Sequence, residues 1–203
     1  MQVLGITGNI AAGKTLIATM LAEHGAHVVD ADALVHELYL RGTPVFQAVA
    51  KRFGDAVAGP DAIDRAALAT IVFANRAAML DLERIVHPAV GDAIRRRLDE
   101  CSPGSPAVIE AIRLVERASA ELIDALWIVT APRDEHIARL GAKRGLGRAD
   151  AEQRLDAQTP PEEKERTFNA RRPGVPVSYI ENAGSVDELR AAVEVAWKAF
   201  LGP

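Results

Sequence analysis

A loop of small residues that ends in a lysine and a hydroxyl is the first feature of the sequence that could do chemistry. Residues 8–15 read GNIAAGKT and fit the pattern G-x-x-x-x-G-K-S/T. In such a loop, backbone N–H groups surround phosphate oxygens, and small side chains let the chain come that close. Lys14 would reach the β- and γ-phosphates of a nucleotide, and the Thr15 hydroxyl would bind Mg²⁺.

The residues on either side of the loop help to interpret it. Residues 3–7 form an apolar run typical of a buried strand, and residues 14–24 have apolar side chains at helical spacing. A plain strand-to-helix turn with a surface lysine is the alternative, but the full pattern in this context favours a phosphate loop. The residues expected to bind ATP here are Gly8, Asn9, Ala11, Ala12, Gly13, Lys14, Thr15 and Leu16.

Two aspartates, Asp30 and Asp32, follow a second short apolar run that begins at His27. In an open α/β sheet, ligands bind beyond the carboxyl ends of the strands. A carboxylate at this edge can orient an acceptor hydroxyl and take its proton during phosphoryl transfer. The alternative is that one of the two, Asp30 above all, is only the N-cap of the next helix. The pair therefore predicts a phosphoryl acceptor near a nucleoside triphosphate.

The acidic residue that usually holds magnesium in such proteins is not obvious. No strong apolar strand ends in the usual magnesium aspartate; the strand expected at residues 107–111 contains Glu110, and the next ends near Thr130. We expect Thr15 to bind the metal directly. Asp30, Asp32 and Glu110 are candidates for holding it through water.

The elements that must position these residues alternate between strand and helix at both ends of the chain. The final helix is predicted to open on a capping box, SVDE, at residues 185–188 and to run to about residue 201. A helix rich in Glu, Arg and Ala is expected between the third and fourth strands. The five expected strands are residues 3–7, 27–30, 107–111, 125–131 and 175–180. This order predicts an α/β protein with the three-layer P-loop fold and a parallel sheet.

Two long segments do not fit simple strand–helix alternation. Residues 33–104 are dominated by helical periodicity, with Thr43-Pro44 and Asp64 as helix starts, and are predicted to be an inserted helical lobe. Residues 136–173 are charged and helical with few large apolar side chains, which is typical of a lid. The core would then comprise residues 1–32, 105–135 and 174–203.

Composition narrows the class of protein. The 203 residues carry a formal net charge of −4, whereas a general nucleic-acid binder is usually basic, so we expect no nucleic-acid partner. The single cysteine, Cys101, permits neither an internal disulfide nor a cysteine metal cluster. No apolar run approaches about 18 residues, so no membrane partner is expected. We expect a cytoplasmic monomer or weak homo-oligomer.

The order of several longer segments resembles the dephospho-coenzyme A kinase family, small P-loop kinases of the nucleoside-monophosphate-kinase type. The resemblance covers nearly the whole chain. It implies transfer of the ATP γ-phosphoryl group to the ribose 3′-hydroxyl of dephospho-CoA, with a nucleotide-binding core, a helical CoA lobe and a lid. The segments are GITGNIAAGKT at 5–15, VVDADAL at 28–34, IVHPAV at 85–90, EAIRLVE at 110–116, HIARLGAKRGLGRADAEQRLDAQ at 136–158 and YIENAGSVDEL at 179–189.

The resemblance also implies roles for single residues. Asp32 matches the family's catalytic base, and Arg139 and Lys143 match lid cations that bind ATP, with Arg139 and Lys14 assisting catalysis. Asn182 matches an asparagine near the adenine. Two further residues are expected to bind the substrate: Glu116, otherwise a charge at a helix start, and His87, otherwise structural.

The chain departs from the family pattern at several positions. The family usually has glycine at the positions of Asn9 and Ala11, serine at Ala12, and glutamine at His136. Lys14, Thr15 and Asp32 are all kept. Two rival interpretations accompany the main one: a P-loop kinase for another small acceptor, and a nucleotide-binding protein without turnover.

Overall fold

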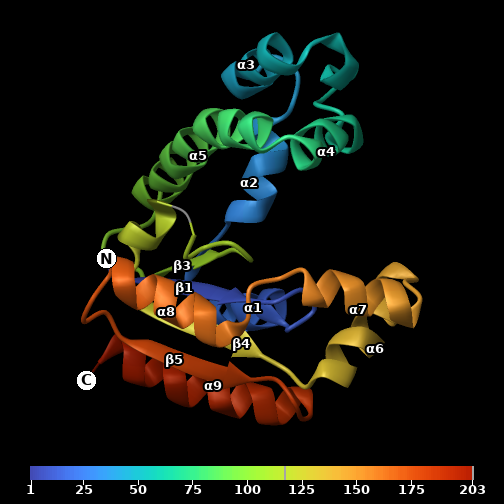
Figure 1. Cartoon of the computed structure of the whole chain (residues 1–203). Coiled ribbons are helices and arrows are strands. Elements are labelled where there is room, and N and C mark those ends of the chain that lie inside the picture. The colour runs from blue at the N-terminus through green and yellow to red at the C-terminus, as the bar shows by residue number, and fades with distance from the viewer. Residues whose placement is uncertain (117, 203) are drawn as a thin grey trace. The chain divides into compact units, whose positions relative to one another are not determined.

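The computed structural model describes residues 1–116 and 118–202 (Figure 1). The chain divides into two compact units. One unit comprises Met1–Asp30 together with Glu100–Pro203, and the other comprises Ala31–Asp99.

A five-stranded parallel sheet forms the centre of the first unit, which confirms the predicted α/β class. The strand order is β2-β3-β1-β4-β5, so β1 lies in the middle, between β3 and β4. Parallel strands all end at the same edge of the sheet, which therefore collects the loops that follow them. The strands are β1 (Val3–Gly8), β2 (His27–Asp30), β3 (Ala107–Glu110), β4 (Ala125–Thr130) and β5 (Val177–Glu181).

Helices pack against this sheet, and α8 and α9 lie to either side of β5 in Figure 1. The predicted capping box opens α9: Ser185 accepts a hydrogen bond from the Glu188 backbone while the Glu188 carboxylate accepts one from Ser185. Trp127 of β4 and Trp197 of α9 meet edge to face in the core, with ring centroids 6.4 Å apart. The helices of this unit are α1 (Lys14–Glu23), α6 (Arg133–Arg144), α7 (Arg148–Asp156), α8 (Pro161–Arg171) and α9 (Val186–Leu201).

The segment between β3 and β4 corrects one prediction. The helix expected there is absent from the described residues, which form turns and a single short 3₁₀ helix, η2 (Ala118–Leu122). Its carbonyl groups instead accept hydrogen bonds from distant side chains: Thr7 and Lys164 donate to Ile112, and Arg171 donates to Val115. The composition of this segment favours a helix, but its described residues do not form one. Its carbonyl groups accept hydrogen bonds from distant side chains in place of the backbone N–H groups of a helix.

The second unit is helical, and the two predicted helix starts in it are confirmed. Thr43 caps α3 by accepting from the backbone of Phe46, and Asp64 caps α4 by accepting from two backbone N–H groups. Its described residues contain isolated β-bridges but no strand. The elements are α2 (Ala31–Leu38), α3 (Pro44–Phe53), the 3₁₀ helix η1 (Asp55–Val57), α4 (Arg65–Ala74) and α5 (Arg76–Asp99), with α2, α3 and α4 all contacting α5.

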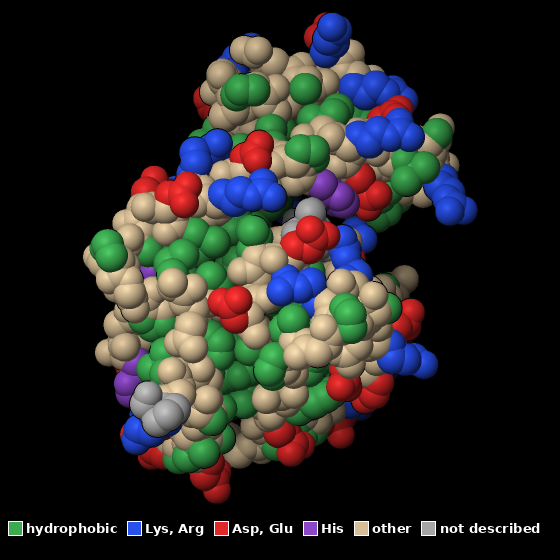
Figure 2. Space-filling view, turned by 90° about the vertical axis from the view of Figure 1, so that its left-hand side faces the viewer, with side chains coloured by type: hydrophobic (Ala, Val, Ile, Leu, Met, Phe, Trp, Pro, Cys, Tyr) green, Lys and Arg blue, Asp and Glu red, His purple; other side chains and the backbone are tan. Residues whose placement is uncertain are grey.

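Acidic and basic side chains are intermixed over the face drawn in Figure 2, in keeping with the small net charge of −4. No helix among residues 1–116 and 118–202 is long and apolar enough to cross a membrane.

Candidate active site

The glycine-rich loop joins the end of β1 to the start of α1, as its pattern predicts. Glycine is required at both ends of it. A Cβ at Gly8 would lie 2.3 Å from the carbonyl oxygen of Val129, and a Cβ at Gly13 would lie 2.1 Å from the side-chain nitrogen of Asn182. Gly13 also has a φ of 106°, a conformation that side chains disfavour.

Lys14 and Thr15 are the first residues of α1 and lie where the loop pattern needs them. Lys14 is buried, and its Nζ donates to the carbonyl of Asn9 across the loop at 3.3 Å. The first N–H groups of a helix have no partner within the helix, so they can donate to an anion. Leu16 follows in the same turn with its side chain partly exposed. The loop thus offers a buried ammonium group and backbone donors together.

Glu110, a candidate acid of the sequence analysis, contacts Thr15. It is buried at the end of β3, which pairs directly with β1, so that Ile6 and Glu110 are in register. Its carboxylate accepts a hydrogen bond from the Thr15 hydroxyl at 2.9 Å. A hydroxyl beside a carboxylate is a donor set that suits a hard cation such as Mg²⁺. Asp30 is in register with Glu110 on the next strand, at the same edge, and is exposed.

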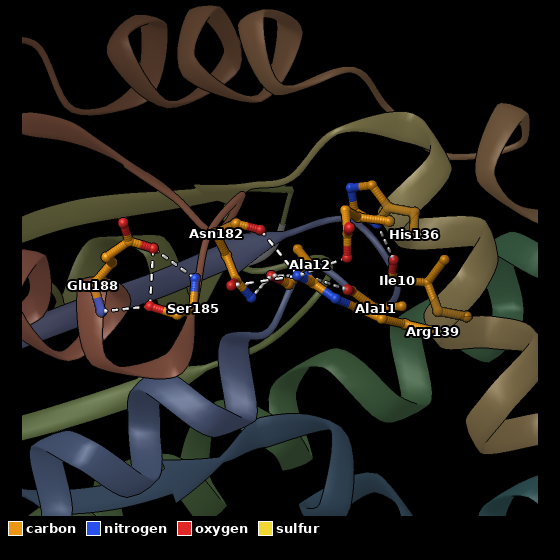
Figure 3. Close-up of polar contacts among 9 residues, drawn as sticks. Ile10, Ala11, Ala12, His136, Arg139, Asn182, Ser185 and Glu188 are labelled. Carbon is orange, nitrogen blue, oxygen red and sulfur yellow. Dashed lines mark hydrogen bonds and ion pairs between the residues drawn. The ribbon is translucent and has the colours of Figure 1, made fainter.

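Asn182 and Arg139 both contact the backbone of the loop (Figure 3). The Asn182 side chain donates to the carbonyl of Ala12 at 2.8 Å. One Arg139 nitrogen donates to the Asn182 carbonyl at 3.0 Å, and the other lies 3.4 Å from the carbonyls of Ala11 and Ala12. Lys143 lies one turn further along α6 and is exposed. The structure therefore brings Arg139 and Asn182 to the loop.

Two residues that the sequence analysis did not assign to the site contact Ile10 in the loop. His136 is buried, and its Nδ1 lies 2.6 Å from the Ile10 carbonyl, which can only accept, so Nδ1 carries the proton. Gln158 accepts from the Ile10 N–H at 2.7 Å. Burial lowers the pKa of His136 below its ordinary value, and the charges of Arg139 and Lys14 lower it further. Neither contact has a local sequence signal, because the partners are more than 100 residues apart.

Lys164 is another residue that the sequence did not single out. Only 1% of it is exposed, and its Nζ donates to the Ile112 carbonyl at 2.9 Å and lies 3.4 Å from Glu116. Thr7, at the end of β1, donates to the same carbonyl at 3.0 Å. Lys164 thus joins α8 to the segment after β3, which contains both Ile112 and Glu116. Its second carboxylate oxygen is buried and has no hydrogen-bond partner among the described residues.

The remaining predicted residues belong to the helical unit. Asp32 lies in the first turn of α2, two residues after the end of β2. His87 lies within α5, immediately before Pro88. Among the described residues, no group of three His, Cys, Asp or Glu side chains is arranged to hold a metal ion.

Comparison with known proteins identifies the family. The family model for dephospho-CoA kinase matches residues 2–171. A dephospho-CoA kinase from Symbiobacterium thermophilum is 42% identical, over 100% of this chain and 82% of the relative. The dephospho-CoA kinase from Geobacter metallireducens is also 42% identical, over 98% of this chain and 96% of its own.

Solved structures share the fold. A crystal structure of a Thermus thermophilus protein is 31% identical with a TM-score of 0.75, covering 100% of this chain and 98% of its own. The dephospho-CoA kinase from Campylobacter jejuni has a TM-score of 0.67 at 22% identity, covering 97% of this chain and 96% of its own. Full-length similarity to kinases of one activity means that this protein uses ATP to phosphorylate dephospho-CoA to coenzyme A. The chain belongs to the dephospho-CoA kinase family.

Proposed function

We propose that residues 8–15 bind the triphosphate of MgATP and that the γ-phosphoryl group passes to the ribose 3′-hydroxyl of dephospho-CoA. The observation that carries this proposal is the buried Lys14 inside a loop whose glycines cannot be replaced without a clash. A buried ammonium group needs a compensating anion or dipole, and the Nζ of Lys14 donates to the Asn9 carbonyl at 3.3 Å. A phosphate oxygen would be a stronger acceptor for it.

The neighbouring residues suggest how charge is neutralised during transfer. When bound, Mg²⁺ would neutralise charge on the β- and γ-phosphates. Thr15 would bind the metal through its hydroxyl, and Glu110 would accept from a metal-bound water. Arg139 donates to the Ala11 carbonyl within the loop and to the Asn182 carbonyl after β5, so a guanidinium lies beside the proposed phosphate site. Lys143 would add a second lid cation, and Asn182 would position the loop beside the adenine.

We assign the binding and activation of the phosphoryl acceptor to residues of the helical unit and to Glu116. Asp32 would take the proton of the attacking hydroxyl, because a carboxylate held next to that group lowers the barrier to its ionisation. His87 and Glu116 would bind the substrate. We assign residues 33–104 to the CoA lobe, 136–173 to the lid, and 1–32, 105–135 and 174–203 to the core. A cytoplasmic location and a monomeric or weakly associated state remain predictions.

The test is ADP release from MgATP with and without dephospho-CoA, together with measurement of the CoA formed. We expect strong stimulation by the acceptor, one CoA per ADP, and loss of both products in Lys14→Ala. ADP release that ignores dephospho-CoA would contradict the proposed acceptor. A panel of other hydroxyl and phosphate acceptors would then separate a kinase of different preference from a protein that binds nucleotide without turnover.

A further inference from the structure

We propose that His136 and Gln158 are positioning residues that hold the Ile10 peptide groups, so that the lid segment sets the shape of the phosphate loop. The inference rests on the proposed role of that loop in binding ATP. It concerns two residues of this chain, one of which, His136, departs from the glutamine usual in the family.

Both backbone groups of Ile10 are bound from the lid segment. The carbonyl accepts from His136 at 2.6 Å, and the N–H donates to Gln158 at 2.7 Å (Figure 3 shows the first contact). Ile10 therefore has neither group left for a nucleotide. The backbone donors available to a phosphate are those that follow it, at the start of α1. The contacts at Ile10 would fix the conformation of the loop. The N–H groups at the start of α1 would bind the phosphate.

The loop needs such an anchor because its own residues do not favour its shape. Ala11, next to Ile10, has a φ of 61°, and it is the one non-glycine residue of the described chain with a positive φ. A side chain in this conformation costs of the order of 1 kcal/mol or more relative to glycine. Asn9 and Ala11 stand where the family usually has glycine, so external contacts must stabilise the conformation here.

Packing supports the two hydrogen bonds. The Ile10 side chain belongs to an apolar cluster with Ile137 and Leu140 of α6 and Ala151 and Leu155 of α7. The cluster therefore includes side chains of α6, whose first turn contains His136, and of α7, which ends two residues before Gln158. The His136 contact is buried and the Gln158 contact is partly buried, and a lower local dielectric strengthens hydrogen bonds.

An ion pair ties the two helices together as well. Arg133 at the start of α6 makes two hydrogen bonds to Asp156 at the end of α7, at 2.6 and 3.0 Å. A paired geometry of this kind fixes orientation as well as distance. The side chains that bind the Ile10 peptide groups thus come from α6 and from the residues just after α7, and this ion pair joins the two helices.

The test compares variants that keep side-chain size and lose one hydrogen-bonding group. His136→Phe removes the donor and Gln158→Met removes the acceptor. We expect each to raise the Kd for ADP and ATP, measured by calorimetry without acceptor, about 3- to 10-fold, as one lost hydrogen bond would. The KM for ATP should rise in parallel, and the KM for dephospho-CoA should stay within about twofold. His136→Gln, which restores a donor, should recover most of the affinity.

Two controls make the result decisive. Tyr179→Phe removes a 2.7 Å hydrogen bond to Glu165 that does not involve the loop, and it should leave the nucleotide Kd unchanged. Lys14→Ala tests the loop itself. Normal nucleotide binding in His136→Phe and Gln158→Met, with binding lost in Lys14→Ala, would overturn the positioning role alone. Normal binding in all three would overturn the assignment of the loop.

Discussion

The hydroxyl of Thr15 donates to the carboxylate of Glu110 at 2.9 Å, which joins the first turn of α1 to the end of β3. The two residues are 95 positions apart, and the pairing of β1 with β3 brings them together. Glu110 is buried, so its charge is not screened by bulk water and acts strongly on its surroundings. This contact supports the proposal that Glu110, a candidate already named from the sequence, helps to hold magnesium.

Glu110→Gln should raise the Mg²⁺ concentration needed for half-maximal activity. The amide can still accept from Thr15, but it carries no charge to orient a metal-bound water. Loss of such an outer partner weakens metal affinity about 10- to 100-fold. Activity is measured against Mg²⁺ at fixed ATP, with thermal unfolding as a check on folding. An unchanged Mg²⁺ dependence would remove Glu110 from the metal site.

Asp32→Asn should bind ATP with unchanged affinity and lose turnover. General-base catalysis contributes about 100- to 10,000-fold to a rate, so kcat should fall within that range. Single-turnover CoA formation measures the loss, and calorimetry measures nucleotide binding. Asp30→Asn is made in parallel because Asp30 is two residues away. A larger loss of turnover in Asp30→Asn than in Asp32→Asn would transfer the base role to Asp30.

Gly13→Ala should abolish nucleotide binding. Its φ of 106° disfavours any side chain, and the new Cβ would lie 2.1 Å from Asn182, which holds the Ala12 carbonyl. Gly25→Ala is the matched control, since Gly25 also has a positive φ, 84°, but has nothing within 4 Å of a Cβ. That variant should lose about 1 kcal/mol of stability and keep its affinity for ATP. Equal affinity in both variants would show that the contact with Asn182 does not matter.

The stability contributed by His136 should depend on pH. Because burial lowers its pKa in the folded protein, the unfolded chain binds a proton at a higher pH, near the ordinary value of 6.5. The free energy of unfolding should therefore fall as the pH drops through and below about 6.5. Urea unfolding at pH 7.5 and 5.5 should show a smaller fall in His136→Gln than in the parent. Equal falls would mean that His136 is not the group responsible.

Local elements could be predicted because their signals lie within a few residues. The strand before the phosphate loop shows as a run of apolar residues. The N-caps Thr43 and Asp64 and the Ser185 capping box depend on side chains that act on backbone groups two or three positions away. The predicted helix after β3 was wrong for the converse reason. Carbonyls there bond to side chains such as Lys164 and Arg171, about 50 positions away, and local composition carries no record of such partners.

By itself, the sequence determined the α/β class, the phosphate-loop pattern with Lys14 and Thr15, and the family resemblance, because each depends on residue type and spacing along the chain. Tertiary structure alone decided that Glu110 meets Thr15 and that His136 and Gln158 meet Ile10. Those contacts depend on strand order and on the packing of α6 and α7 against the loop. Packing brings together residues that are far apart in the chain, so these contacts cannot be predicted from the periodicity of the sequence.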